Sequence, residues 1–274
     1  MKSLYESRPE EDKVLIRDVC NYILNQPLKQ KPPSNDFAAI YVDGRDRDFK
    51  TREDYACIYS FKTFSKFDYP VFIFTQFPER WEWQGFTRVF INKTEPINSL
   101  EEYSEFCKKL YFLLPSYIEN VITIQPDGML LKHGYEEFIQ SQNVDWLSSH
   151  WKHFARVEIK LDFDNIALTS PTAVGNGGFS YRKVSKMREI SSRFGGLSLK
   201  ECGRDDNRPP MEDLFYCAFM NSFSQYKMPS LEQCCQFSVD PLDRNIFNLF
   251  LSGKRNLFGF HFIKHQSEFP YCHF

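Results

Sequence analysis

Acidic side chains stand at two places in the chain where a carboxylate could act on a bound ligand. Asp127 lies in the tetrapeptide Gln125–Gly128 at the end of an apolar run, and the adjacent Glu212 and Asp213 lie where a helix is predicted to begin. At the carboxyl end of a parallel strand, where α/β sheets bind ligands, Asp127 would suit Mg²⁺ or Mn²⁺. A carboxylate of the pair could act as a general base towards a hydroxyl. A Pro-Asp-Gly turn and a favourable helix dipole are the structural explanations of the same residues.

A glycine-rich segment lies between these carboxylates. Residues 175–182 read Gly-Asn-Gly-Gly-Phe-Ser-Tyr-Arg and precede a predicted helix that begins near Lys183. Glycines allow a ligand or another strand to approach the backbone closely, and a helix N-terminus with cations suits a phosphate or a sugar. The segment matches neither a P-loop nor a dinucleotide-binding fingerprint, so a glycine turn is the alternative.

Histidine and cysteine give no recognisable metal-binding pattern. His261 follows the apolar segment 258–260, where a lone histidine is more often a hydrogen-bonded core residue than a ligand. The eight cysteines show no metal-ligand spacing. We expect reduced thiols in a cytoplasmic protein.

Apolar periodicity supplies the elements that would position these residues. Runs at 37–42, 71–75 and 121–125 predict buried strands, and alternation over 157–163 predicts a half-buried one. Helices are predicted at 10–24, 54–65, 100–114 and 183–194, with another beginning near residue 211. Ser99 followed by Glu102 marks the start of the third of these helices as a capping box. The recurring order of strand, helix and strand predicts the α/β class, with a parallel sheet covered by helices.

Length and composition limit the organisation of the chain. With 274 residues it is long enough for one large α/β domain, and we expect residues 1–36 to form an N-terminal helix and linker before a single domain at 37–274. The net charge of -2 argues against a nucleic-acid partner held by a basic surface. The N-terminus lacks the apolar core of a signal peptide, and no apolar run approaches the roughly 18 to 20 residues of a membrane span.

A short pattern points to a different enzyme class. Pro126-Asp127 followed by Glu158-Ile159-Lys160 has the residue types and order of the PD-(D/E)XK nuclease signature. In that signature two carboxylates hold Mg²⁺ and a lysine assists the attack of water on a phosphodiester. A nuclease of this type is therefore an alternative.

Taken in order, several segments resemble an uncharacterised glycosyltransferase-like family known as a domain of unknown function. The resemblance runs from about residue 37 to residue 264. The matching segments are Gln125-Pro126-Asp127, Asp145-Trp146 through Trp151, Gly175 to Arg182, Glu212-Asp213, Phe237-Ser238-Val239 and Gly259-Phe260-His261.

The resemblance implies a GT-A-like fold, in which a mixed, Rossmann-like sheet flanked by helices binds a nucleotide and a second half binds the acceptor. It implies that Asp127 and His261 contact a metal ion, Mn²⁺ or Mg²⁺, and the diphosphate. Gly177, Gly178 and Arg182 would bind the donor, and Asn176 and Trp151 would bind the acceptor. Asp213, or else Glu212, would be the catalytic base. Asp43 and Arg45, after the first strand, stand where a GT-A protein contacts its nucleotide.

The implied function is the transfer of a sugar from a nucleoside-diphosphate sugar to a hydroxyl of a glycan or other acceptor, with inversion and with the help of a divalent metal. GT-A enzymes usually carry an Asp-x-Asp metal motif, whereas Asp127 is followed by Gly128 and Met129. The missing second carboxylate leaves a non-enzymatic alternative, a degenerate protein that binds a nucleotide sugar or glycan without turnover.

Overall fold

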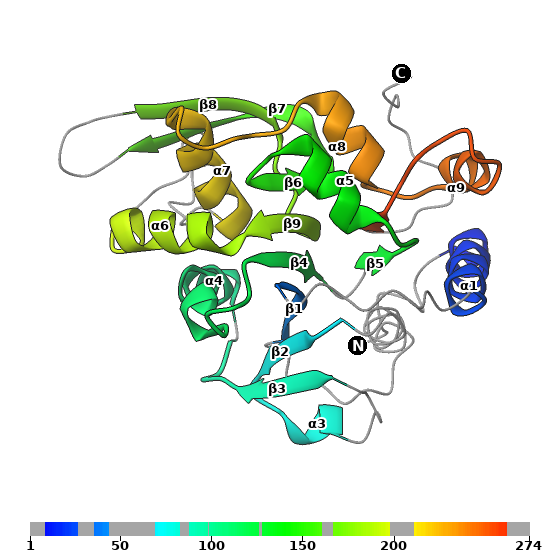
Figure 1. Ribbon diagram of the computed structural model, residues 1–274, viewed down its shortest axis with the longest axis horizontal. Coiled ribbons are helices and arrows are strands. Elements are labelled where there is room, and N and C mark those ends of the chain that lie inside the picture. Colours follow the sequence, from blue (N-terminus) through cyan, green and yellow to red (C-terminus); the bar gives the residue numbers. More distant parts are fainter. Residues whose placement is uncertain are drawn as a thin grey trace.

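A six-stranded sheet runs through the middle of the molecule (Figure 1). The computed structural model of the protein describes residues 9–26, 36–43, 69–82, 88–97, 99–125, 128–160, 167–197 and 211–261. The strand order is β3-β2-β1-β4-β9-β6. These strands are β1 (Phe37–Asp43), β2 (Val71–Thr75), β3 (Val89–Lys93), β4 (Asn120–Ile124), β6 (Trp146–Ser148) and β9 (Phe179–Lys183).

The sheet is mixed. β1, β2, β3 and β4 are parallel, as the continuous apolar runs of β1, β2 and β4 predict, whereas β9 is antiparallel to both β4 and β6. The predicted α/β class with a mixed sheet flanked by helices is therefore confirmed. The apolar runs favour parallel strands, and β9 departs from this because the chain enters it from the edge at which β4 ends.

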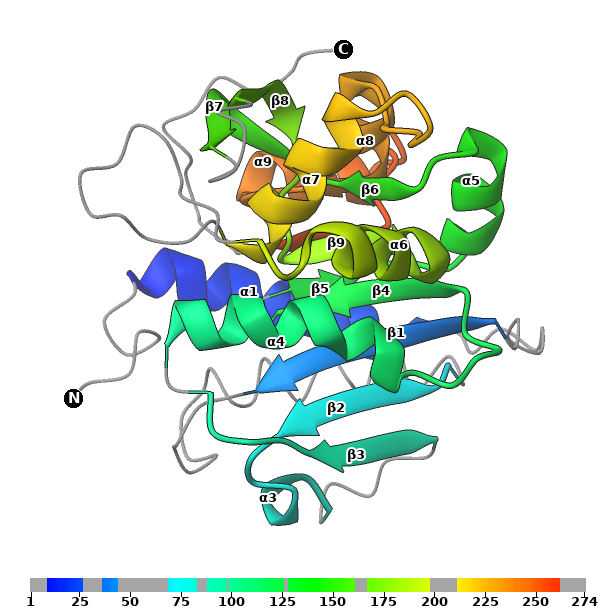
Figure 2. The same cartoon turned by 90° about the vertical axis from the view of Figure 1, so that its left-hand side faces the viewer.

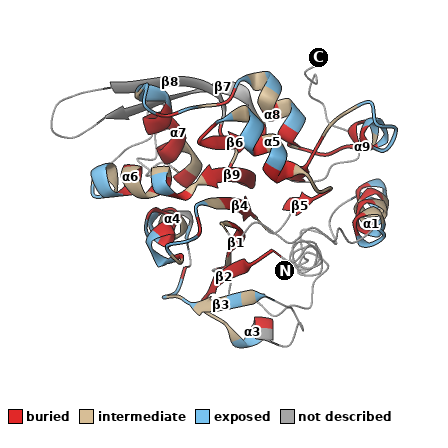
Figure 3. Ribbon diagram, viewed as in Figure 1, coloured by how far each residue is buried: buried red, intermediate tan, exposed pale blue. Residues whose placement is uncertain are grey.

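Both faces of the sheet are covered, since successive side chains of a strand point to opposite faces. On one side Phe37, Ala39 and Tyr41 of β1 pack with residues of α3 (Glu79–Glu82), α5 (Tyr135–Gln142) and α8 (Leu231–Phe237). On the other, Ala38 and Ile40 pack with residues of α4 (Leu100–Leu113), α6 (Val184–Phe194) and α7 (Glu212–Ser222). Figure 2 shows α4 and α6 lying along the sheet, and Figure 3 shows that β2, β4, β6 and β9 are mostly buried whereas the edge strand β3 is not.

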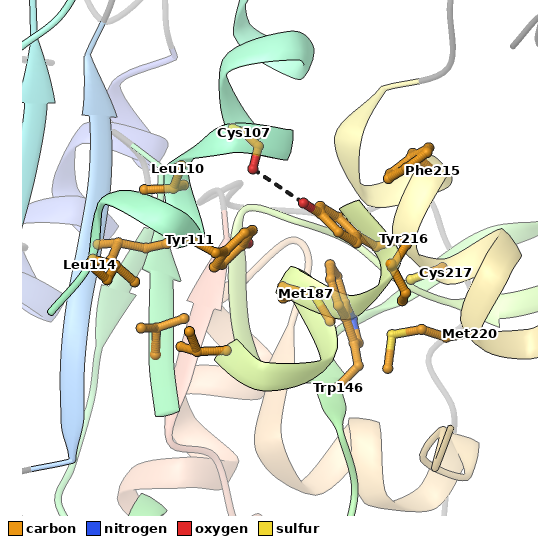
Figure 4. Close-up of a cluster of buried hydrophobic side chains, with 14 of the residues drawn as sticks. Cys107, Leu110, Tyr111, Leu114, Trp146, Met187, Phe215, Tyr216, Cys217 and Met220 are labelled. Atoms are coloured by element: carbon orange, nitrogen blue, oxygen red, sulfur yellow. Dashed lines mark hydrogen bonds between the residues drawn. The ribbon is translucent and has the colours of Figure 1, made fainter. Parts of the chain in front are cut away.

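The second of these clusters is rich in aromatic side chains and joins three helices to the sheet (Figure 4). The Tyr216 hydroxyl of α7 donates to the carbonyl of Cys107 in α4 at 3.2 Å, and its ring meets Tyr111 edge to face. The start of α4 is fixed by Ser99, whose side chain accepts from the Glu102 N–H at 3.1 Å. α7 is thereby held at a defined position beside the sheet.

Two smaller sheets complete the described part of the chain. β5 (Gly128–Leu130), β10 (Ser238–Val239) and β11 (Gly259–His261) form one of them, in the order β10-β11-β5. β7 (His150–Lys160) and β8 (Ala167–Val174) form the other. The residues 158–160 of the nuclease pattern thus lie in a different sheet from β4, while Pro126 and Asp127 lie outside the described residues.

The predicted N-terminal helix is α1 (Glu10–Leu24). Its residues Leu15, Val19 and Ile23 are buried in a cluster with Ile246 and Phe250 of α9 (Arg244–Leu251). The helix thus packs against the C-terminal part of the fold; the domain boundary at residue 36 stays a prediction. The predicted helix at 54–65 lies outside the described residues. In the described part of the chain, no helix combines the length and apolarity needed to cross a membrane.

Candidate functional site

The carboxyl ends of the four parallel strands meet at one edge of the sheet. From β1 the chain moves outward to β2 and β3 and then returns to the other side of β1 as β4. Open α/β sheets bind ligands outside the carboxyl ends of the strands at such a switch point. Asp43, only 5% exposed, ends β1 there, and Gln125 follows β4. The switch point therefore lies beside the ends of β1 and β4, both of which are followed by residues predicted from the sequence to bind a ligand.

The glycine-rich loop reaches the same edge because β9 runs antiparallel to β4. Phe179 lies opposite Ile124 in the register, and the Gln125 N–H donates to the Gly178 carbonyl at 2.8 Å. Gly128, in turn, pairs with His261 between β5 and β11. Residues from three separate parts of the chain thus converge around the end of β4.

Gly178 lies directly against the imidazole of His261. A Cβ atom at Gly178 would stand 2.1 Å from Cδ2, 2.2 Å from Cγ and 2.4 Å from Nε2 of this ring. Atoms in contact are ordinarily about 3.5 to 4.0 Å apart, so no larger residue fits without displacing the ring. Glycine is required here by the close approach of another strand, which is one of the two explanations that the sequence allowed.

Asn176 shapes the loop with both ends of its side chain. Its Oδ1 accepts from the Gly178 N–H at 2.9 Å, and its Nδ2 donates to Asp240 Oδ2 at 2.5 Å. The same Asp240 oxygen lies 3.5 Å from Nδ1 of His261. Asp240 is not among the residues predicted from the sequence, although it directly follows Phe237-Ser238-Val239, one of the segments that carry the family resemblance.

Asp213, in the first turn of α7, faces the loop from the other side. Its Oδ2 accepts from the Gly177 N–H at 3.1 Å and its Oδ1 from the Leu214 N–H at 2.8 Å. Burial, and next the neighbouring charge of Glu212, raise the pKa of Asp213 to about 7, although Arg182 and the two N–H groups oppose the shift. A half-buried carboxyl group with a pKa near neutrality suits a general base.

Glu212 is buried in an ion pair with Arg182. The two side chains are 1% and 0% exposed, and Arg182 Nη2 lies 3.2 Å from Glu212 Oε1. The guanidinium carbon lies 4.3 Å from the centre of the Trp146 ring. Arg182 also donates hydrogen bonds to Ser180 Oγ at 3.0 Å, the Tyr111 hydroxyl at 2.9 Å and the Gly177 carbonyl at 3.3 Å. All of these contacts are buried, and the hydrogen bond from Arg182 to the Gly177 carbonyl links the buried ion pair to the loop.

The two acidic neighbours therefore differ in accessibility. Glu212 faces the buried arginine, and its Oε2 accepts no hydrogen bond from the described residues. Asp213 is half-buried and holds the loop amide directly. Of the two predicted bases, Asp213 has the surroundings that general base catalysis requires, because a base must reach the hydroxyl that it deprotonates.

The structure brings together most of the predicted site. The residues that converge on the loop are Asn176, Gly177, Gly178, Arg182, Glu212, Asp213 and His261. Asp127 and Arg45 lie outside the described residues, and Trp151 is placed in β7 by its backbone alone. Their assigned contacts stay predictions.

Two side chains near the loop could contribute to a metal site. Within the described ranges, no group of three or more His, Cys, Asp or Glu side chains is arranged to hold a metal ion. His261 and Asp240 offer one nitrogen and one carboxylate beside the loop. Mg²⁺ in nucleotide sites is commonly held by one or two carboxylates together with substrate phosphates and water. His261 could therefore ligate a divalent ion whose remaining ligands come from a diphosphate and water, while Asp240 contacts the Nδ1 side of its ring.

The sequence model of the family described as Protein of unknown function (DUF5672) matches residues 86–261. No curated protein matches the chain. Among solved structures, the chain is similar to core-mannan synthase A from Aspergillus fumigatus in its Mn/GDP form, with 9% sequence identity and a TM-score of 0.46, over 73% of this chain and 72% of that one. The family match includes each residue described above as converging on the loop.

Proposed function

Since the chain belongs to the family described as Protein of unknown function (DUF5672), whose description names no activity, we propose a function from the site itself: transfer of a sugar from a nucleoside-diphosphate sugar to a hydroxyl acceptor. The observation that carries the proposal is the position of Asp213. Its carboxylate is bound to the Gly177 N–H at the switch point of a sheet whose first strand ends in Asp43. The carboxylate that we propose as the base therefore contacts the loop at the end of β4, and α/β sheets bind ligands at this edge.

In the proposed complex the donor lies along this edge. Asp43 and Arg45 contact the nucleotide, and Asp127 and His261 lie at the diphosphate. Gly177 and Gly178 form the part of the loop that lies at the donor, and their lack of side chains lets Glu212 and Arg182 pack against Gly177 and His261 pack against Gly178. Asn176 and Arg182 hold the loop through their contacts with Asp240 and Glu212, and Trp151 contacts the acceptor. A divalent cation, when bound, would offset the negative charge that develops on the leaving diphosphate.

The chain's own chemistry in the transfer is the movement of one proton. Asp213 accepts the proton of the acceptor hydroxyl as its oxygen attacks the anomeric carbon. The new carbon–oxygen bond forms while the bond from that carbon to the diphosphate oxygen breaks, and the nucleoside diphosphate leaves with the bonding electron pair. A single displacement of this kind inverts the anomeric carbon. With its pKa near 7, Asp213 is ionised in a large fraction of molecules at neutral pH, and it still binds a proton readily.

A second candidate function is the binding of a nucleotide sugar or glycan without turnover. The observation that favours it is the lack, among the residues that the structure describes, of a cluster of three metal-ligating side chains. A binding protein of this kind would hold the donor with or without a divalent cation. It would leave the donor intact.

The proposal is tested by measuring the rate of sugar transfer by two matched variants. Asp213→Asn removes the base but keeps an oxygen that accepts from the Gly177 N–H, so we expect the transfer rate to fall by about 10²- to 10⁴-fold with nucleotide binding unchanged. Glu232→Gln, on the exposed face of α8, changes the charge equally and serves as the control. Donor binding without transfer or hydrolysis by the wild type would favour the second candidate, and equal loss of binding and transfer in Asp213→Asn would make this residue structural.

A further inference from the structure

Asp240 joins two segments of the site that are far apart in the sequence. It lies between β10 and α9, and its Oδ2 accepts from Asn176 Nδ2 of the loop at 2.5 Å. The same oxygen lies 3.5 Å from Nδ1 of His261, at the end of β11. One carboxylate oxygen therefore contacts both the loop before β9 and the C-terminal strand of the site.

These contacts form a closed circuit of four residues. Asp240 binds Asn176, the Asn176 carbonyl oxygen accepts from the Gly178 N–H, and Gly178 lies against the imidazole of His261, which returns to Asp240. Because each of the four residues contacts two others, a displacement of one of them is transmitted to the rest. Asp240 is a charged group that touches two members of this set at once.

We propose that Asp240 is a positioning residue of this site, which fixes the orientation of the His261 ring and ties it to the Asn176 turn. At 3.5 Å the Asp240 oxygen makes an electrostatic contact with Nδ1 of His261 and not a hydrogen bond, and this contact favours the ring orientation that turns Nδ1 towards the carboxylate. Removal of a carboxylate that orients a ligating histidine commonly weakens metal binding by about 10- to 100-fold. The effect of Asp240 on ligands rests on the proposed function. Its effect on the orientation of the His261 imidazole and on the loop is independent of the proposed function.

Nuclear magnetic resonance of the free protein tests the positioning directly. One hydrogen of Gly178 points towards the position that a Cβ atom would occupy. That position is 2.1 to 2.4 Å from three atoms of the His261 ring, so this hydrogen lies over the face of the ring. Its resonance should therefore be shifted upfield by the ring. We expect Asp240→Ala to abolish this shift and to move the Gly178 amide resonance as well.

Two further variants separate the contacts. Asp240→Asn retains an oxygen for Asn176 but loses the charge towards His261, so it should keep the Gly178 amide near its wild-type position while the ring-induced shift decreases. Glu232→Gln, on α8, is the control and should leave both resonances unchanged. Unaltered Gly178 and His261 resonances in Asp240→Ala would overturn the proposal.

A double-mutant cycle tests the consequence for ligands. Binding of nucleoside diphosphates with Mn²⁺ should weaken about 10- to 100-fold in Asp240→Ala, and much less when His261→Ala is already present. Equal losses in both backgrounds would contradict an action through His261. If the wild type binds none of these nucleotides, the proposed function fails, and the resonances of the free protein still decide the positioning role.

Discussion

Gly178→Ala is the substitution whose effect the structure determines most closely. The added methyl group would lie 2.1 to 2.4 Å from three atoms of the His261 ring. Because ordinary contacts are about 3.5 to 4.0 Å, the ring or its strand must move by more than about 1 Å. β11 is paired with β5 through Gly128, so the strand itself resists this movement.

The expected cost is that of overpacking, about 1 to 3 kcal/mol of unfolding free energy. For a protein of this size each kcal/mol lowers the melting temperature by about 2 to 4 °C, so a decrease of roughly 2 to 12 °C is expected. Since misplacement by about 1 Å can reduce a rate about 10²-fold, sugar transfer should fall by a similar factor even below the melting temperature.

Two controls make the assay specific. Gly196→Ala, at the exposed end of α6, introduces a methyl group with no atom within 4 Å and should leave melting and transfer unchanged. Gly178→Ala combined with His261→Ala removes the clash and should recover most of the lost stability, though not the activity. A Gly178→Ala protein that melts as the wild type does and keeps its His261 resonances would refute the reasoning.

The remaining predictions concern three charged groups. Arg182→Leu leaves Glu212 buried without its partner and should cost about 3 to 5 kcal/mol in denaturant unfolding, most of which Glu212→Leu in the same chain should restore; a small loss would contradict the buried pair. Burial raises the pKa of Asp213 from about 3.9 to about 7, so the folded state binds the proton more tightly, and unfolding free energy should fall as pH rises from about 4 to about 7. Asp213→Asn should flatten this slope, and an equal slope in both proteins would contradict it. Asp43→Asn should weaken nucleotide binding by about 10- to 100-fold in calorimetric titration, whereas unchanged affinity would remove Asp43 from the site.

The elements of the fold were predictable where their signals are local. The runs that became β1, β2 and β4 are apolar on both faces because each is covered on both sides by helices. Ser99 marked the start of α4 because its hydroxyl caps the helix within three residues. The antiparallel direction of β9 had no such signal, since it depends on where the preceding loop lies.

The site was predictable in its residues but not in its contacts. The loop 175–178, the acidic pair and His261 were identified, and the structure places them together. Asp240 was missed because its partners Asn176 and His261 are 64 and 21 positions away in the chain. Arg182 was assigned to the donor, yet its contacts with Tyr111 and Trp146 form only when the sheet and α4 assemble.

The most direct test of the central claim is thermal unfolding of the wild type with nucleoside diphosphates and nucleotide sugars, each with and without Mn²⁺. A ligand at about 100 times its dissociation constant should add about 2.7 kcal/mol and raise the melting temperature by several degrees. We predict a shift that is selective for one nucleotide and larger with Mn²⁺. The absence of a shift with every nucleotide would contradict a donor site at the carboxyl edge of the sheet.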